Sequence, residues 1–345
     1  MAEVALGDDV ARVVEQAEAL ARAGSHRAAI DLLTATNRSH PDSRLELALL
    51  AVRREGGAPV PGSTSVDQAP IEGEAGDGTI YEVAGADLSV AALRTGLARS
   101  GCLWVRGLID DARVAHLTRG IDAAFAAYDA VTEGAEDVDP GWYTPCSMPD
   151  RTGGGLPEKV RRVFMRRDGG LVTADSPRML VELLELVDEV GIGALMTEFL
   201  GERPLLSANK CTLRRIEPTD VMGGWHQDGA FLGDAVGSFN LWLALSDCGT
   251  DAPGMDIVPT RIPRVIPSDE ESQFDWSLSE RAVREAAADA PIVRPQFRAG
   301  DALLFDHRLV HRTAASAQMT RARYAIESWF FAPSAYPVGQ LPLLY

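Results

Sequence analysis

The sequence predicts a mainly β fold in which helices flank a β barrel and a small helical hairpin precedes it. Residues 239–245 are apolar apart from one Asn and are bounded by polar residues, which is typical of a buried strand. A turn at Asp251–Gly254 then leads into a second apolar segment, Met255–Val258. Strand, turn and strand in this order favour an all-β barrel. Helical periodicity near the start of the chain indicates a separate N-terminal region.

The N-terminal region is predicted to be helical. Apolar residues recur at helical spacing over residues 9–23, 26–37 and 41–54, and Gly24 and Gly56 are stop signals. The pattern resembles a single tetratricopeptide repeat, and one repeat is too small to bury its own apolar face. Two interpretations stay open. The region is either a helical hairpin packed on the barrel or on a second subunit, or a peptide-binding array.

A flexible linker is expected after these helices. Residues 55–78 are rich in Gly, Pro, Ala and Ser and contain acidic residues but no basic one. Such a composition buries too little apolar surface to fold by itself. We therefore expect a tetratricopeptide-like helical region at 1–55, a linker at 56–78 and a barrel domain at 79–345.

Composition and charge exclude several classes of function. The net charge of −17 argues against nonspecific nucleic-acid binding, which needs basic surface. The chain shows no apolar stretch long enough to span a bilayer and no signal-peptide pattern at its start, so a cytoplasmic protein is expected. The four cysteines show neither zinc spacing nor a secreted disulfide pattern, which fits a reducing compartment.

The motif that carries chemistry is Trp225-His226-Gln227-Asp228-Gly229. In an extended strand, side chains two residues apart point to the same side, so His226 and Asp228 are expected to reach one metal ion together. Non-haem iron oxygenases use two imidazoles and one carboxylate on one face of the metal. A second imidazole must then come from elsewhere in the chain.

His307 and His311 are the two candidates for the third metal ligand, and both lie in the segment that follows Gly300. We favour His311, because a strand that begins at Arg323 follows within hairpin reach of it. His307 is expected behind the metal ligands or on the surface. Arg323 is predicted to bind the distal carboxylate of 2-oxoglutarate through charge-assisted hydrogen bonds, with Arg321 as the alternative.

At this point the chain resembles the phytanoyl-CoA dioxygenase-like family of Fe(II)/2-oxoglutarate-dependent dioxygenases. The resemblance extends over about residues 79 to 335 and depends on an ordered set of motifs. These motifs are Leu93–Leu108, Phe199–Gly201, Trp225–Ala230, Leu241–Leu245, Gly254–Pro259, Leu309–Thr313 and Arg323–Ile326. The loop after Pro259 departs from the family, because Thr-Arg-Ile replaces the usual Gly-Ser-His.

The resemblance implies a double-stranded β-helix, a jelly-roll barrel of the cupin type, with helices outside it. It also implies site residues at matching positions. The iron ligands would be His226, Asp228 and His311, and the co-substrate would contact Arg323, Thr313, Trp242 and Leu213. The cofactors implied are Fe(II), 2-oxoglutarate and O₂.

A long segment with weak periodicity, residues 131–159, interrupts the barrel domain. Segments of this length without regular structure are commonly functional lids, and we predict a mobile lid over the iron. Four arginines follow it. They are interpreted as a solvated basic face, with an anionic group of the substrate or co-substrate as the alternative partner. The four are Arg161, Arg162, Arg166 and Arg167.

The favoured hypothesis is a 2-oxoglutarate-dependent hydroxylase that acts on an unactivated C–H bond of a small molecule and releases succinate and CO₂. The carboxylate of Asp228 favours hydroxylation over halogenation and leaves desaturation, epimerisation and cyclisation open. Two alternatives remain: a cupin-type isomerase or lyase that uses a metal without 2-oxoglutarate, and a catalytically silent barrel in a helical scaffold. The expected partner is a small-molecule substrate, not nucleic acid or membrane. The N-terminal helices are a possible surface for a homo-oligomer or another protein.

Overall fold

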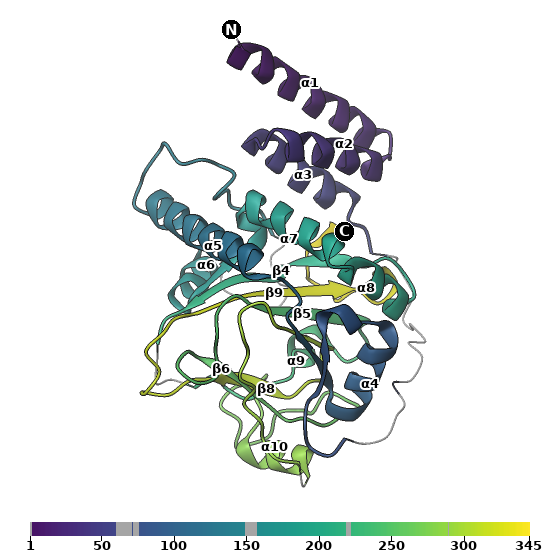
Figure 1. Ribbon diagram of the computed structural model, residues 1–345, viewed down its shortest axis with the longest axis vertical. Coiled ribbons are helices and arrows are strands. Elements are labelled where there is room, and N and C mark those ends of the chain that lie inside the picture. Colours follow the sequence, from purple (N-terminus) through teal and green to yellow (C-terminus); the bar gives the residue numbers. More distant parts are fainter. Residues whose placement is uncertain (1, 60–70, 72–75, 149–156, 219–221, 289) are drawn as a thin grey trace.

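The computed structural model of the chain consists of two facing β-sheets, a helical layer on the larger sheet and a helical region at one end (Figure 1). Residues outside the description are 1, 60–70, 72–75, 149–156, 219–221 and 289. The expected linker at 56–78 therefore lies largely outside the described residues. Within the described ranges, every helix is too short or too polar to cross a membrane.

Among the described residues, eight strands form the larger sheet in the order β1-β2-β7-β5-β9-β4-β10, and β3 pairs with β4 beside this path. The pairs are antiparallel apart from β1 with β2. The strands are β1 Tyr81–Ala84, β2 Cys102–Arg106, β3 Gly170–Val172, β4 Leu205–Ile216, β5 Ser238–Ala244, β7 Ala302–Phe305, β9 Arg323–Phe331 and β10 Pro342–Leu344. The smaller sheet pairs β6, Gly254–Ile257, with β8, His311–Ala314.

This arrangement of two facing sheets confirms the predicted jelly-roll barrel with flanking helices. The position of strand β5 explains why most of its residues are apolar. Its alternate residues Leu241 and Leu243 pack against the outer helices, whereas Trp242 and Ala244 pack between the two sheets. A strand buried on both faces has no polar side, so its apolar residues form a continuous run.

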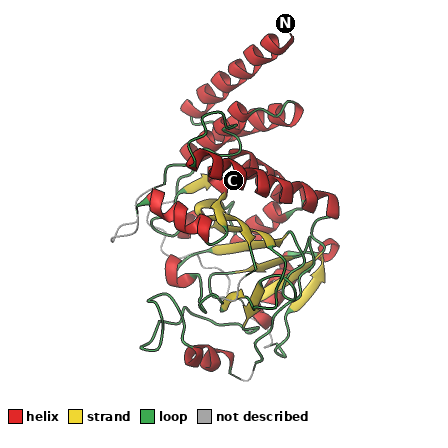
Figure 2. Cartoon of the chain, turned by 90° about the vertical axis from the view of Figure 1, so that its left-hand side faces the viewer, coloured by secondary structure: helices red, strands yellow, loops and turns green. Residues whose placement is uncertain are grey.

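The outer layer lies on one face of the larger sheet and leaves the other face to the barrel interior (Figure 2). Its long helices are α4 Val90–Ser100, α5 Asp111–Thr132, α7 Pro177–Glu189 and α8 Ile192–Leu200. Helix α4 begins at a side-chain cap, because the hydroxyl of Ser89 accepts from the amide of Ala92. It ends at Gly101, whose φ of 73° suits a glycine better than any other residue.

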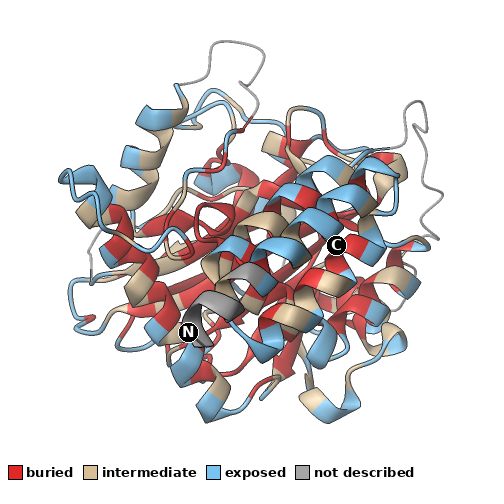
Figure 3. Ribbon diagram, turned by 90° about the horizontal axis from the view of Figure 1, so that it is seen from above, coloured by how far each residue is buried: buried red, intermediate tan, exposed pale blue. Residues whose placement is uncertain are grey.

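The N-terminal region contains α1 Ala2–Arg22, α2 His26–Ser39 and α3 Ser43–Gly56, which follow the predicted helical segments. Helix α3 packs against α7 and β10, and Val181 of α7 is part of the apolar cluster inside the region. Figure 3 shows the outward sides of these helices exposed and the layers beneath them buried. The structure therefore shows a helical unit that packs on the barrel, and a peptide-binding role for this region stays a prediction.

Candidate functional site

Two histidines that are far apart in the sequence are hydrogen-bonded to each other through their backbones. The amide of His226 donates to the carbonyl of His311 at 3.0 Å, and the amide of His311 donates back to the carbonyl of His226 at 3.1 Å. Their rings lie 4.4 Å apart, centroid to centroid. Donor atoms of His226, Asp228 and His311 all lie within 4.8 Å of one another. The structure therefore brings together the three predicted ligands.

The backbone also fixes which imidazole nitrogen faces the cluster. The Nδ1 of His226 lies 2.9 Å from the carbonyl oxygen of Gly224, and the Nδ1 of His311 lies 3.1 Å from that of Leu309. Because a carbonyl only accepts, each Nδ1 carries the proton and each Nε2 keeps a free lone pair. Burial and the neighbouring His311 lower the pKa of His226 to about 4, which keeps this ring neutral and able to bind a metal.

Asp228 is not part of an extended strand, as the sequence analysis expected. It lies in the helical region of backbone space, with φ −63° and ψ −23°, directly before the short helix α9, Gly229–Leu232. The prediction was wrong because the turn packs closely at Gly229, whose amide donates to the carbonyl of His307. A Cβ at position 229 would lie 3.0 Å from the ring of His307. The turn still directs the carboxylate toward the two imidazoles.

The two carboxylate oxygens of Asp228 have different neighbours. Oδ1 accepts from the ammonium of Lys210 at 3.2 Å, whereas Oδ2 lies 3.7 Å from the Nε2 of His311. Burial by itself would raise the pKa of Asp228, but Lys210 and the two imidazoles keep it below its usual value. The group is therefore an anion with one oxygen directed at the imidazoles and the other held by Lys210.

A cavity of about 1000 Å³ between the two sheets contains this cluster and the predicted co-substrate residue Arg323. The guanidinium of Arg323 is 4% exposed and donates to the carbonyl of Gly254 at 2.9 Å. Its Nε has no hydrogen-bond partner among the described residues. Burial lowers the pKa of Arg323 to about 10, so the group stays cationic near neutral pH. The alternative, Arg321, is exposed and does not line the cavity.

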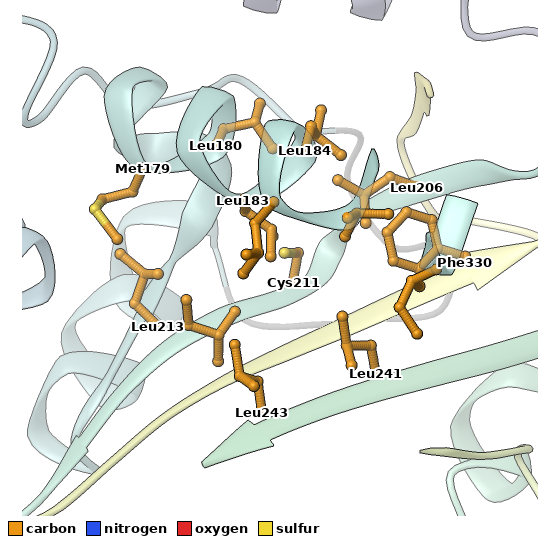
Figure 4. Packing of buried hydrophobic residues seen from close by; sticks show 14 of the residues in the cluster. Met179, Leu180, Leu183, Leu184, Leu206, Cys211, Leu213, Leu241, Leu243 and Phe330 are labelled. Atoms are coloured by element: carbon orange, nitrogen blue, oxygen red, sulfur yellow. The ribbon is translucent and has the colours of Figure 1, made fainter. Parts of the chain in front are cut away.

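Thr313 and Trp242 also line this cavity, and the Arg323 guanidinium lies 5.8 Å from the centre of the Trp242 ring. Leu213 does not, which corrects the sequence analysis. It is fully buried between β4 and α7, beside Met179 and Leu183 (Figure 4). Successive side chains of a strand alternate between its faces, so the neighbouring Arg214 faces the cavity in place of Leu213.

His307 does not join the metal cluster and is not a surface residue. It is 3% exposed, its Nδ1 lies 2.7 Å from the hydroxyl of Ser238, and its Nε2 lies 3.2 Å from the carbonyl of Asp234. Burial lowers its pKa. His307 therefore supports the turn at Gly229 from behind, and the choice of His311 over His307 agrees with the geometry.

The sequence analysis missed several residues around the cluster. The carboxamide of Gln227 points away from the cavity, donates to the carbonyls of Arg264 and Arg308, and accepts from the amide of Ile266. It therefore anchors the motif to two other loops. Lys210 could have been found, because alternate residues of β4 are polar where the strand faces the cavity.

Aromatic rings form one wall beside His226. Phe231 lies 6.1 Å from the His226 ring, Trp276 lies 5.9 Å from it, and Phe274 stacks on Trp276 at 5.0 Å. The ammonium of Lys210 lies 4.4 Å from the centre of the Phe231 ring. Phe231 follows the motif closely, in α9, whereas the loop that carries Phe274 and Trp276 meets the motif only in the folded chain.

The expected lid at 131–159 lies partly outside the described residues. Its described part is attached to the helical layer, because the amides of Thr144 and Cys146 donate to Asp175. Arg162 does not belong to a solvated basic face, since it forms an ion pair with the buried Asp175 at 2.6 Å. The other three arginines lie on α6, Glu158–Arg167, partly or fully exposed.

A family model described as phytanoyl-CoA dioxygenase matches residues 97–322, well over half of the chain. The chain belongs to the phytanoyl-CoA dioxygenase family. The resemblance seen in the sequence is thereby confirmed, and with it a place among Fe(II)/2-oxoglutarate-dependent oxygenases.

Several solved structures share features of this fold at low identity. AviO1 from Streptomyces viridochromogenes Tue57 is 20% identical, with 72% of this chain and 98% of that chain covered and a TM-score of 0.46. The carbocyclase SnoK from nogalamycin biosynthesis is 18% identical, with 76% and 99% covered and a TM-score of 0.47. EctD from S. alaskensis, solved with 2-oxoglutarate and 5-hydroxyectoine, is 15% identical, with 81% and 84% covered and a TM-score of 0.48. No curated protein matches the chain.

Proposed function

We propose that this member of the phytanoyl-CoA dioxygenase family hydroxylates an unactivated C–H bond of a small-molecule substrate and uses Fe(II), 2-oxoglutarate and O₂. The donor set fits the metal, because two imidazole nitrogens and one carboxylate oxygen face the same space. His226, Asp228 and His311 would hold the iron. When bound, iron and 2-oxoglutarate supply the oxidising chemistry that yields succinate, CO₂ and a hydroxylated product.

The observation that carries the proposal is the buried guanidinium of Arg323 in the same cavity as the cluster. An arginine that loses its water needs hydrogen-bond acceptors, and one of its nitrogens has none among the described residues. A carboxylate offers two acceptor oxygens in the geometry of the guanidinium fork. The buried guanidinium therefore favours an enzyme that binds 2-oxoglutarate over a metal-dependent isomerase or lyase that works without it.

The other residues orient and shield the reactants. Thr313 is the expected second donor to the distal carboxylate, because it lines the cavity on the strand that carries His311. Trp242, Met255 and Phe305 supply apolar walls that exclude water from the space around the cluster. Lys210 holds the Oδ1 of Asp228 and so leaves Oδ2 for the metal. The carboxylate of Asp228 would be the third protein ligand, and its presence favours hydroxylation over halogenation.

The test is anaerobic addition of Fe(II) and then 2-oxoglutarate to the full chain, followed by visible absorption. We expect the weak charge-transfer band of a chelated 2-oxo acid, and succinate formation once O₂ is admitted. Wild-type protein that binds Fe(II) without giving the band would favour the isomerase or lyase hypothesis. Protein that binds no metal would favour the catalytically silent barrel.

A further inference from the structure

A second cavity, of about 560 Å³, adjoins the cavity of the metal cluster. The two cavities share three lining residues, Asp168, Arg214 and Phe231. Phe231 borders the predicted metal ligands, since its ring lies 6.1 Å from that of His226. The second cavity and the cavity of the metal cluster therefore meet at Phe231. We call the second cavity the side chamber.

The walls of the side chamber are largely apolar, whereas those of the first cavity are about equally polar and apolar. Helix α6 supplies two of these side chains, and the rest come from β3, α9 and the segment before α6. They are Met148, Phe164, Met165, Val172 and Phe231. Phe164 is 41% exposed although it is a large apolar residue. Exposed apolar walls beside a reaction site are typical of a site that buries an apolar part of a ligand.

The arginines that line the side chamber differ in whether they already form an ion pair with a carboxylate. Arg162 pairs with Asp175 and Glu158, and Arg214 pairs with Glu327 at 3.1 Å. Arg161 forms no ion pair with any described residue, and its Nε is a buried atom without a hydrogen-bond partner there. Among the described cations of the side chamber, the Arg161 guanidinium is therefore the one that can donate hydrogen bonds to an anionic oxygen of a ligand.

We propose that the substrate is an amphipathic organic acid: its apolar ring system or acyl chain occupies the side chamber, its anionic group binds Arg161, and the carbon to be oxidised lies past Phe231. This inference rests on the proposed function for the reaction itself. The binding site is defined by the chamber alone, so the two can be tested apart.

The test uses two fluorescent probes with the full chain, both with and without Mn(II) and 2-oxoglutarate. One is 1-anilinonaphthalene-8-sulfonate, which is aromatic and anionic, and the other is N-phenyl-1-naphthylamine, which is aromatic and neutral. We expect both to bind at one site. Arg161→Gln should weaken the sulfonate about tenfold and the amine less than about twofold, because it removes one hydrogen bond to a charged group.

Phe164→Gln should weaken both probes by about threefold or more, because it removes apolar wall from the chamber. Two control variants match these changes away from either cavity. Arg119→Gln removes an exposed arginine from α5, and Val338→Gln removes an apolar side chain that is 93% exposed. Neither should change the affinity of either probe. Circular dichroism of each variant shows whether the fold is kept.

A probe bound in the side chamber should also lie close enough to the metal site for a paramagnetic ion there to broaden its resonances. Mn(II) should broaden the proton resonances of bound anilinonaphthalene sulfonate in the wild type but not in Asp228→Ala, in which the metal site is broken. Unchanged affinity in folded Arg161→Gln and Phe164→Gln would overturn the proposal, and so would a bound probe that Mn(II) does not broaden. Chamber binding in a protein that gives no 2-oxoglutarate band would overturn only the proposed reaction.

Discussion

Arg323 and Arg321 lie two residues apart in the sequence, but their side chains differ in solvent exposure. Arg323 is buried in the cavity, and its Nε has no hydrogen-bond partner within the described part of the chain, whereas Arg321 is exposed. The first prediction compares their glutamine variants. Arg323→Gln should raise the dissociation constant of 2-oxoglutarate by about 10- to 100-fold, because it removes charge-assisted hydrogen bonds. Arg321→Gln should leave it within about twofold. Titration of the charge-transfer band measures both, and equal effects would remove Arg323 from the co-substrate site.

The second prediction separates the metal ligands from the residue behind them. Asp228→Ala should abolish succinate formation, because it removes the anionic ligand and leaves Lys210 without its partner. His307→Ala should keep the charge-transfer band but lower the free energy of unfolding by about 1–3 kcal/mol, because Ser238 loses a buried hydrogen bond. Loss of the band in a folded His307→Ala protein would show that His307 acts on the metal.

For single residues, the sequence predicts which polar side chains reach the cavity better than it predicts which face of a strand a side chain occupies. His226, Asp228, His311 and Arg323 were each placed in the cavity by residue type and order. Leu213 was misplaced because a shift of one residue moves a strand side chain to the opposite face. The role of Gln227 depends on contacts with two other loops, which spacing within one segment does not encode.

The turn into α9 is an element that only the folded chain reveals. Gly229→Ala, the third prediction, should lower Mn(II) affinity about tenfold, because a methyl group there would press against Val265 and the ring of His307 and displace Asp228. The neighbouring Ala230 is exposed, so Ala230→Ser should leave the affinity unchanged. Mn(II) titration followed by electron paramagnetic resonance measures both. A Gly229→Ala protein that binds Mn(II) normally would show that the turn tolerates a shift.

Elements with a strong apolar pattern agree with the sequence analysis. Strands β5 and β6 fall within a residue or so of the predicted segments, and α2 and α3 follow the predicted helical spacing. Residues 226–228 do not, because His226 forms only two isolated bridges, to Ser277 and His311, and Asp228 leads into α9. A two-residue spacing suits an extended segment and a turn equally well, so the tertiary contacts at Gly229 decide between them.

The helical region is joined to the barrel domain by polar contacts as well as apolar ones. Glu46 of α3 is 2% exposed and accepts from Arg178 of α7 at 2.7 Å. The fourth prediction is that Glu46→Ala lowers the free energy of unfolding by about 2 kcal/mol or more, because it leaves a half-buried guanidinium with less compensation. Urea unfolding measures it.

The matched control is an exposed ion pair that also joins the helical region to the barrel domain. Arg38 of α2 pairs with Glu185 of α7 at 2.9 Å, and its side chain is 60% exposed. Arg38→Ala should change the free energy of unfolding by less than about 1 kcal/mol, because water screens an exposed pair. Similar losses in the two variants would mean that the Glu46 pair is no stronger than a surface contact.

The fifth prediction concerns the stability of the whole molecule. Binding to the folded state alone stabilises it by mass action, by about 2.7 kcal/mol at a ligand concentration one hundred times the dissociation constant. Mn(II) should therefore raise the melting temperature of the wild type and leave that of Asp228→Ala unchanged. Thermal denaturation followed by circular dichroism measures this, and an equal rise in both would place the ion at another site.

For the whole molecule, the sequence predicted the barrel and the helical region but left open how the two are combined. Helical spacing identifies an apolar face on α3 without naming what covers it. The cover is α7, through Val181 and Arg178. These residues are distant in sequence from the helices they meet, and no local pattern signals the contact.

The reciprocal backbone hydrogen bonds between His226 and His311 link two segments that are widely separated in the chain. Each backbone donates one of the bonds and accepts the other, so neither segment can slide along its neighbour without breaking both. A register error between these two segments during folding would therefore separate the two imidazole rings, and the pairing acts as a check on correct assembly of the barrel.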